Sequence, residues 1–86
     1  MDIPTYRRVL AELIKEALEN SDGTTRGVSE YLDNKKIPRF LVRNRKEKLR
    51  ALSEAREAFD EHMVWPVDIV ISHLGVDRED LEKLSS

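Results

Sequence analysis

The chain has 86 residues, a formal net charge of −2 and no cysteine. Its length fits one small domain covering residues 1–86, and the absence of cysteine excludes disulfides and thiolate zinc sites. No apolar run approaches the roughly 20 residues that span a bilayer, so we expect a cytoplasmic protein with no membrane role. The mixture of 40% apolar and 37% charged residues is typical of helices with one buried face.

The first two helices are predicted from apolar spacing and from turn residues. Gly23 can take the left-handed conformation that ends a helix, and Thr24 or Thr25 can cap the short helix that follows. The buried face of the first helix is expected to be Tyr6, Val9, Leu10, Leu13, Ile14, Ala17 and Leu18. The buried face of the second is expected to be Val28, Tyr31 and Leu32.

A third helix is predicted to begin at Pro38 and to run to about His62. Arg45 and Arg56 fall on its apolar side, which indicates either a partly exposed face or a break near residue 45. Pro66 interrupts the helix, because proline disfavours helical geometry in the residue before it. The expected inner face of this helix is Leu41, Val42, Leu49, Leu52, Ala55, Phe59 and Met63.

Two short helices are predicted at the end of the chain. The first spans residues 67–74 and ends at Gly75, and the second has Asp77 as its N-cap with Asp80 in the third helical position. The segment from Leu74 to Leu81 resembles the end of phage-repressor-type helix-turn-helix domains, in which an apolar helix, a Gly-Val turn and a short acidic helix close the core. No strand pattern competes. The fold class that follows is all-α, with four to five helices and a helix-turn-helix-like core.

Basic residues are concentrated in residues 35–50. Eight of the fifteen Lys and Arg residues lie there with Glu47 as the one acid, so this window carries +7 and the remainder −9. In the predicted third helix these charges occupy the N-terminal half, against the helix dipole, and a bound phosphate or carboxylate would relieve that cost. Four of them, at spacings of four, three and four residues, would share one side of the helix: Arg39, Arg43, Lys46 and Arg50. The pattern indicates an anionic partner.

One hypothesis is a DNA-binding regulatory protein. The segment from Thr25 to Arg50 has the outline of a helix-turn-helix, in which the basic helix (about 38–50) enters the major groove of double-stranded DNA. Arg favours guanine edges and Asn favours adenine, whereas Lys and further Arg residues contact phosphates. A homodimer would double the contact surface. The expected base contacts are Arg39, Arg43 and Asn44, and the expected phosphate contacts are Lys35, Lys36, Lys46 and Arg50.

The alternative is a non-enzymatic helical module that docks an acidic protein surface, with Phe40 or Trp65 as an anchor. A third interpretation is an ordinary solvated helix face, because Lys and Arg commonly fill such faces. An acidic stripe on the first helix, Glu12, Glu16 and Glu19, matches the spacing of the basic stripe. It lies opposite that helix's apolar face, so we expect the two stripes to be held apart within one molecule and to pair only between molecules.

No catalytic constellation is visible, and the sequence predicts neither enzyme activity nor a cofactor. His62 and His73 lie on opposite sides of the Trp65-Pro66 break, and neither has a metal-type partner three or four residues away. The three glycines form no phosphate-binding loop.

Overall fold

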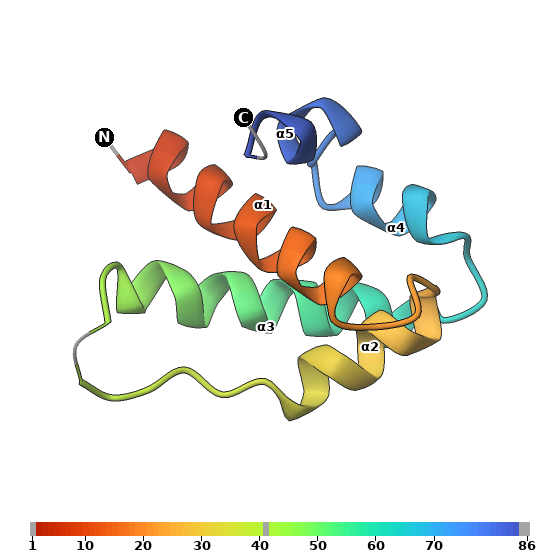
Figure 1. Cartoon of the computed structure of the whole chain (residues 1–86), viewed down its shortest axis with the longest axis horizontal. Coiled ribbons are helices and arrows are strands. Elements are labelled where there is room, and N and C mark those ends of the chain that lie inside the picture. Colours follow the sequence, from red (N-terminus) through yellow and green to blue (C-terminus); the bar gives the residue numbers. More distant parts are fainter. Residues whose placement is uncertain (1, 41, 85–86) are drawn as a thin grey trace.

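The computed structural model describes residues 2–40 and 42–84 as five helices with their connections (Figure 1). No strand occurs in these residues, which confirms the all-α class. The central helix is α3, which packs against α1, α2 and α4, whereas α5 packs against α1. In chain order the helices are α1 (Asp2–Glu19), α2 (Thr25–Asn34), α3 (Arg45–Glu61), α4 (Val67–His73) and α5 (Arg78–Lys83).

The hydrophobic core lies between α1, α2 and α3 and is closed by α4 and α5. Phe59 of α3 and Ile14 of α1 are fully buried, and each such side chain contributes roughly 1.5–3 kcal/mol when it leaves water. The predicted apolar faces of the first two helices are confirmed, because all ten of their residues lie in the core or against it. The other fully buried large apolar side chains are Val28, Leu32, Val70, Ile71 and Val76.

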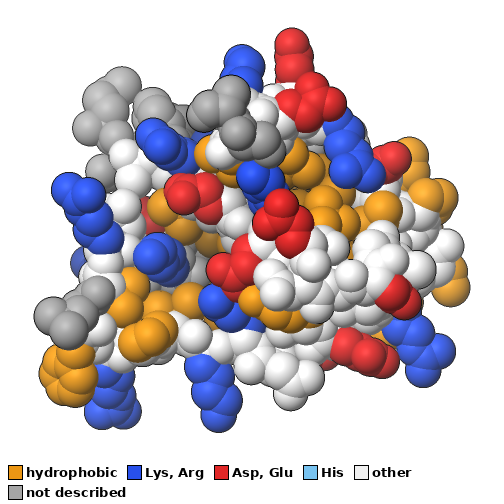
Figure 2. Space-filling view, in the orientation of Figure 1, with side chains coloured by type: hydrophobic (Ala, Val, Ile, Leu, Met, Phe, Trp, Pro, Cys, Tyr) orange, Lys and Arg blue, Asp and Glu red, His pale blue; other side chains and the backbone are white. Residues whose placement is uncertain are grey.

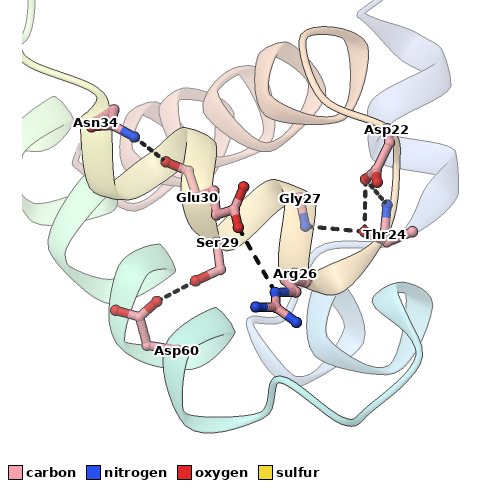
Figure 3. Close-up of polar contacts among 8 residues, drawn as sticks. All are labelled: Asp22, Thr24, Arg26, Gly27, Ser29, Glu30, Asn34 and Asp60. Atoms are coloured by element: carbon pink, nitrogen blue, oxygen red, sulfur yellow. Dashed lines mark hydrogen bonds and ion pairs between the residues drawn. The ribbon is translucent and has the colours of Figure 1, made fainter.

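Helix α2 begins at an N-cap that is formed by side-chain hydrogen bonds (Figure 3). Gly23 has φ +81 and turns the chain, and the Thr24 hydroxyl accepts a hydrogen bond from the Gly27 N–H at 3.0 Å. Thr24 is therefore the cap of the two candidates. Asp22 Oδ1 in turn accepts from the Thr24 N–H at 3.0 Å. A Cβ on Gly27 would lie 2.0 Å from that same oxygen, so a larger residue there would require the Asp22 side chain to move.

Both ends of α2 are fixed by polar groups. At the N-terminal end the buried Thr25 hydroxyl donates to the Trp65 carbonyl at 2.5 Å. At the C-terminal end Arg56 of α3 donates from Nε to the Leu32 carbonyl and from Nη2 to the Lys35 carbonyl, each at 2.7 Å. The last carbonyls of a helix have no partner within it. Arg56 therefore caps α2 instead of intruding on the core.

The third helix starts seven residues later than the sequence predicts. It begins at Arg45 instead of Pro38, and residues 35–44 form a ten-residue connection. Asn44, the residue before the helix, is left-handed with φ 55, and such a residue cannot lie inside a helix. Arg45 donates from Nε to the Pro38 carbonyl at 3.1 Å. The alternative of a break near residue 45 is thus the correct one.

The late start of α3 also changes its inner face. Leu52, Ala55 and Phe59 are buried as predicted, whereas Leu49 and Met63 are exposed. Val42 lies in the connection, and Leu41 lies outside the described residues.

The last two helices follow their sequence signals. Gly75 has φ +82 between α4 and α5, and the Asp77 N–H donates to the Asp80 carboxylate at 3.0 Å. This hydrogen bond holds the pKa of Asp80 below its ordinary value. An ion pair of 3.5 Å between Arg7 of α1 and Asp80 joins α5 to the first helix, so the end of the chain packs beside its beginning (Figure 1).

Candidate nucleic-acid interface

The structure places five of the seven predicted site residues between α2 and α3 and two on α3, so the four residues of the predicted basic stripe do not share one helix face. Lys35 is the residue that follows α2, and Asn44 is the residue that precedes α3. Lys46 and Arg50 lie on α3. The other three lie in the connection between the two helices: Lys36, Arg39 and Arg43.

Two of the predicted residues are neutralised within the molecule. Lys35 Nζ lies 2.6 Å from Glu16 Oε2 of α1. Arg50 donates from Nε to Glu54 Oε1 at 3.1 Å, and its guanidinium stands 4.3 Å from the centre of the Tyr6 ring. Both cations therefore contribute to contacts within the fold. To bind an external anion, each would have to share or leave its present partner.

Glu16 is the centre of a polar cluster that the sequence prediction missed. Its carboxylate accepts hydrogen bonds from Lys35 and from the Tyr31 hydroxyl. Burial disfavours its ionisation, but these hydrogen bonds and the nearby Lys48 outweigh burial, so the pKa of Glu16 lies below its ordinary value. The hydrogen bond to Glu16 also raises the pKa of Tyr31 to about 12. Lys35 is not one of the four residues of the basic stripe, so the expected separation of the acidic and basic stripes stays a prediction.

Four cations remain without a partner. Their side chains are exposed and make no hydrogen bond or ion pair with any described residue. They surround the connection and the first turn of α3, where Figure 2 shows blue side chains along the left edge of the molecule. We call Lys36, Arg39, Arg43 and Lys46 the cation cluster.

Arg43 and Lys46 of the cluster flank the N-terminus of α3, whereas Lys36 and Arg39 lie earlier in the connection. Asn44 makes no side-chain cap hydrogen bond, and the first amide groups of a helix carry partial positive charge. Lys46 in the first turn adds to this positive potential, and Glu47 offsets part of it. The surface is therefore suited to an anion with several acceptor oxygens, such as the phosphates of a nucleic acid.

Phe40 is exposed within this segment. Its side chain is 79% accessible, although it lies between two arginines of the cluster in the sequence. Beside the segment is a hollow of about 470 Å³ whose lining from α1, the connection and α3 is partly apolar and partly charged, the charged residues being Glu12, Glu16, Lys35, Lys36, Arg43 and Lys48. Phe40 does not line this hollow, so the ring has no described apolar surface to cover. The apolar part of the lining consists of Val9, Leu13, Ile37, Pro38 and Val42.

A different surface occupies the opposite end of α3. Val64 is 93% exposed and Ile69 is 52% exposed, and both lie near the turn from α3 to α4. In the same turn the rings of His62 and Trp65 stack with their centroids 3.6 Å apart, and His73 packs edge-on at 5.0 Å from His62. We call Met63, Val64, Trp65, Pro66 and Ile69 the apolar corner.

The described residues contain no group of three or more His, Cys, Asp or Glu side chains that could hold a metal ion. Within the same part of the chain, no helix combines the length and apolar character needed to cross a bilayer. Comparisons with protein-family models, with curated proteins and with solved structures give no match. The functional assignment therefore rests on the surface itself.

One sequence signal could have placed these residues better. Asn44 and Glu47 stand three residues apart in the order of an N-cap and its third helical position, which marks a helix start at Arg45. The pairing of Glu16 had no such signal, because it joins α1 to the residue after α2 and depends on the angle between the two helices.

Proposed function

We propose that this protein is a DNA-binding regulatory protein that contacts the nucleic acid through the cation cluster. One observation carries the proposal: four exposed cations in the connection and the first turn of α3 have no partner among the described residues. In a chain with a net charge of −2, the acidic remainder would be repelled by DNA and would orient the cluster toward it. A cytoplasmic location is part of the same proposal.

The free energy of such binding comes mainly from counterion release. Each phosphate neutralised by Lys or Arg releases condensed cations, so log K falls against log salt with a slope of about −0.9 per contact on duplex DNA. Four contacts give a slope of roughly −3.6, and nonspecific dissociation constants of about 10⁻⁴–10⁻⁶ M are typical. Arg39, Arg43 and Asn44 are the candidates for base contacts, because Arg and Asn read guanine and adenine edges.

The test is fluorescence anisotropy with a labelled mixed-sequence DNA, as a duplex and as one separated strand, titrated across salt. We expect binding at 50 mM salt with the slope given above. The triple variant Arg39→Gln, Arg43→Gln, Lys46→Gln should reduce the magnitude of the slope by about three-quarters on either form of DNA.

A matched control removes the same charge elsewhere. Arg7, Arg26 and Arg78 are exposed arginines on α1, α2 and α5, and each already has a carboxylate partner. Changing these three to Gln should alter the slope by much less than the cluster variant does. Equal losses in the two triple variants would show that net charge, and not the cluster, attracts DNA. Absence of binding by the wild type to both forms of DNA would refute the proposal.

Protein docking is the second candidate function, and the apolar corner is the observation that favours it. Exposed contiguous apolar residues commonly mark interaction sites, and Trp is enriched at binding hot spots. If the corner joins two copies of the chain, Val64→Asp and Ile69→Asp should abolish self-association measured by analytical ultracentrifugation.

An acidic protein could instead occupy the cation cluster. Lys substitutes well for Arg as a point charge but not in bidentate base readout. The double variant Arg39→Lys, Arg43→Lys should therefore retain an acidic protein partner and lose sequence-dependent DNA affinity.

A further inference from the structure

We infer that the nucleic acid bound by the cation cluster is single-stranded, with an unpaired base stacked on the ring of Phe40. This inference rests on the proposed function and names the form of nucleic acid that the same surface takes. Its carrying observation is the juxtaposition of a large exposed aromatic ring with four cations, three in the connection and Lys46 in the first turn of α3, that have no partner among the described residues.

The exposure of Phe40 needs an explanation. A phenylalanine is most often buried, yet this ring is 79% accessible and lines none of the described hollows. Arg39 precedes it in the chain and Arg43 follows three residues later. An aromatic platform set among cations that track a phosphate backbone is the general design of single-strand binding surfaces.

Duplex DNA fits the same surface less well. In a duplex the base faces are covered by their neighbours, so a ring can reach them only by unstacking a step, which costs energy. Groove readout by Arg39 and Arg43 would need both residues on a recognition helix, but α3 begins at Arg45. The side chain of that residue is already directed to the Pro38 carbonyl, and Glu47 adds a negative charge in the first turn.

A single strand presents both exposed base faces and phosphates, which match the aromatic ring and the cations of this surface. Every base has a π-face that can stack on Phe40, and the flexible backbone can place its phosphates at Lys36, Arg39, Arg43 and Lys46 without matching a groove. Stacking is sequence-tolerant, because it does not use hydrogen bonds to base edges. The salt slope should be smaller than on duplex DNA, since each contact on a single strand contributes only about −0.7.

The experiment combines a change in the protein with a change in the strand. Phe40→Leu keeps an apolar side chain of similar size and removes the aromatic face, whereas Phe40→Trp keeps that face. The strands are a labelled 20-nucleotide mixed-sequence DNA and an abasic strand of the same length. Anisotropy is measured at 50 mM salt and over a salt series, and circular dichroism verifies that both variants are helical.

We expect Phe40→Leu to weaken binding to the normal strand by roughly 5- to 150-fold. Its affinity for the abasic strand and for the duplex should change less than about twofold, and its salt slope should equal that of the wild type, because no charge is removed. Phe40→Trp should retain the affinity for the normal strand.

The outcomes that overturn the inference differ from those that overturn the proposed function. Equal affinity of Phe40→Leu and the wild type for the normal strand, with a steep salt slope in both, removes base stacking and leaves DNA binding intact. Retained affinity in Phe40→Leu with loss in Phe40→Trp would show an apolar wedge. Sedimentation with phosphatidylserine vesicles at salt where the strand is released would assign the ring to a lipid surface. Failure of the wild type to bind strand or duplex removes both proposals.

Discussion

The two ends of α3 present opposite kinds of surface. The N-terminal end carries the cation cluster, where the charges have no partner among the described residues. The C-terminal end carries the apolar corner, where Val64 is almost fully exposed and has no apolar cover. Between them the helix is buried along Ala51, Leu52, Ala55 and Phe59. One helix therefore separates two surfaces that suit different partners.

This difference shows how the small domain keeps two surfaces independent. Each is held to a different end of α2: Arg56 fixes the start of the basic connection, and Thr25 holds the Trp65 carbonyl of the apolar corner. Attraction at the cation cluster falls as salt screens it, whereas apolar contact does not weaken in this way. Salt titration can thus assign a partner to one end or the other, and substitutions between the two ends show what they share.

The largest effect is expected from Phe59→Ala, which should remove both surfaces together. Phe59 is fully buried in the last turn of α3 and belongs to the core that supports the whole helix, and truncation of such a side chain costs about 3–5 kcal/mol. A domain of this size has a free energy of unfolding near the lower end of about 5–15 kcal/mol. Urea denaturation followed by circular dichroism measures the loss, with the exposed Ser53→Ala as control. A loss below about 1 kcal/mol would mean that the core packing of Phe59 does not support both ends.

The basic end is tested by Arg56→Met. The substitution retains much of the apolar stem and leaves the Leu32 and Lys35 carbonyls without their donors. Loss of hydrogen bonds from a charged group costs about 1.5–3 kcal/mol. Arg50→Met is the control, because Arg50 makes an exposed pair with Glu54 and such pairs contribute at most about 1 kcal/mol. Similar losses in the two variants would contradict the capping role of Arg56.

The apolar end is tested by Thr25→Val, which removes the donor to the Trp65 carbonyl and keeps the side-chain shape. The expected cost is about 1 kcal/mol. Trp65 is the one tryptophan in the chain, so its fluorescence reports on this end of the molecule directly. Thr25→Ser retains the hydroxyl and should restore most of the stability. If Ser and Val at this position behave alike, the hydrogen bond does not hold the corner.

The smallest effect concerns pH at the basic end. The folded-state pKa of Glu16 lies below its ordinary value of 4.5. Its contribution to stability is therefore present above pH 4.5 and is lost as pH falls through the lower folded value. Glu16→Gln should lose less stability than the wild type between pH 6 and pH 3 in urea denaturation. Its 40% exposed side chain keeps the effect modest.

Glu12→Gln is the control for this prediction, because Glu12 makes only an exposed pair with Arg8 at 3.8 Å. Identical pH profiles in wild type and Glu16→Gln would show that the contact with Lys35 and Tyr31 does not link stability to pH.

Sequence patterns predicted most of the fold because its signals are local. Apolar spacing identified the buried faces of α1 and α2. Thr24 marked the start of α2, and Gly75 and Asp77 marked the turn between α4 and α5, through capping chemistry that involves neighbouring residues. The predicted start of α3 was wrong because Arg39 and Arg43 are four residues apart, a spacing that is typical of a helix but also occurs in other structures. The Asn44–Glu47 signal contradicts that reading and is short enough to be overlooked.

The candidate site was predictable in composition but not in arrangement. Charge counting located the basic segment, yet it could not tell paired cations from unpaired ones. Lys35 is neutralised by Glu16, nineteen positions away, and Arg56 caps carbonyls more than twenty positions away. Such pairings depend on how the helices cross, and nothing in the local sequence encodes that angle.

The two guanidinium groups that bind the basic connection also reduce the length of chain that moves freely in this loop, and so reduce its closure entropy. Arg56 binds the Lys35 carbonyl and Arg45 binds the Pro38 carbonyl. Both arginines belong to α3, so this helix holds the connection between α2 and α3 at two points in its first half. Halving the effective length of a loop saves about 0.6 kcal/mol of closure entropy. A partner that docks on Phe40 and Arg39 then has fewer backbone angles to immobilise. Under the proposed function, these two contacts would lower the entropy cost of binding at this segment.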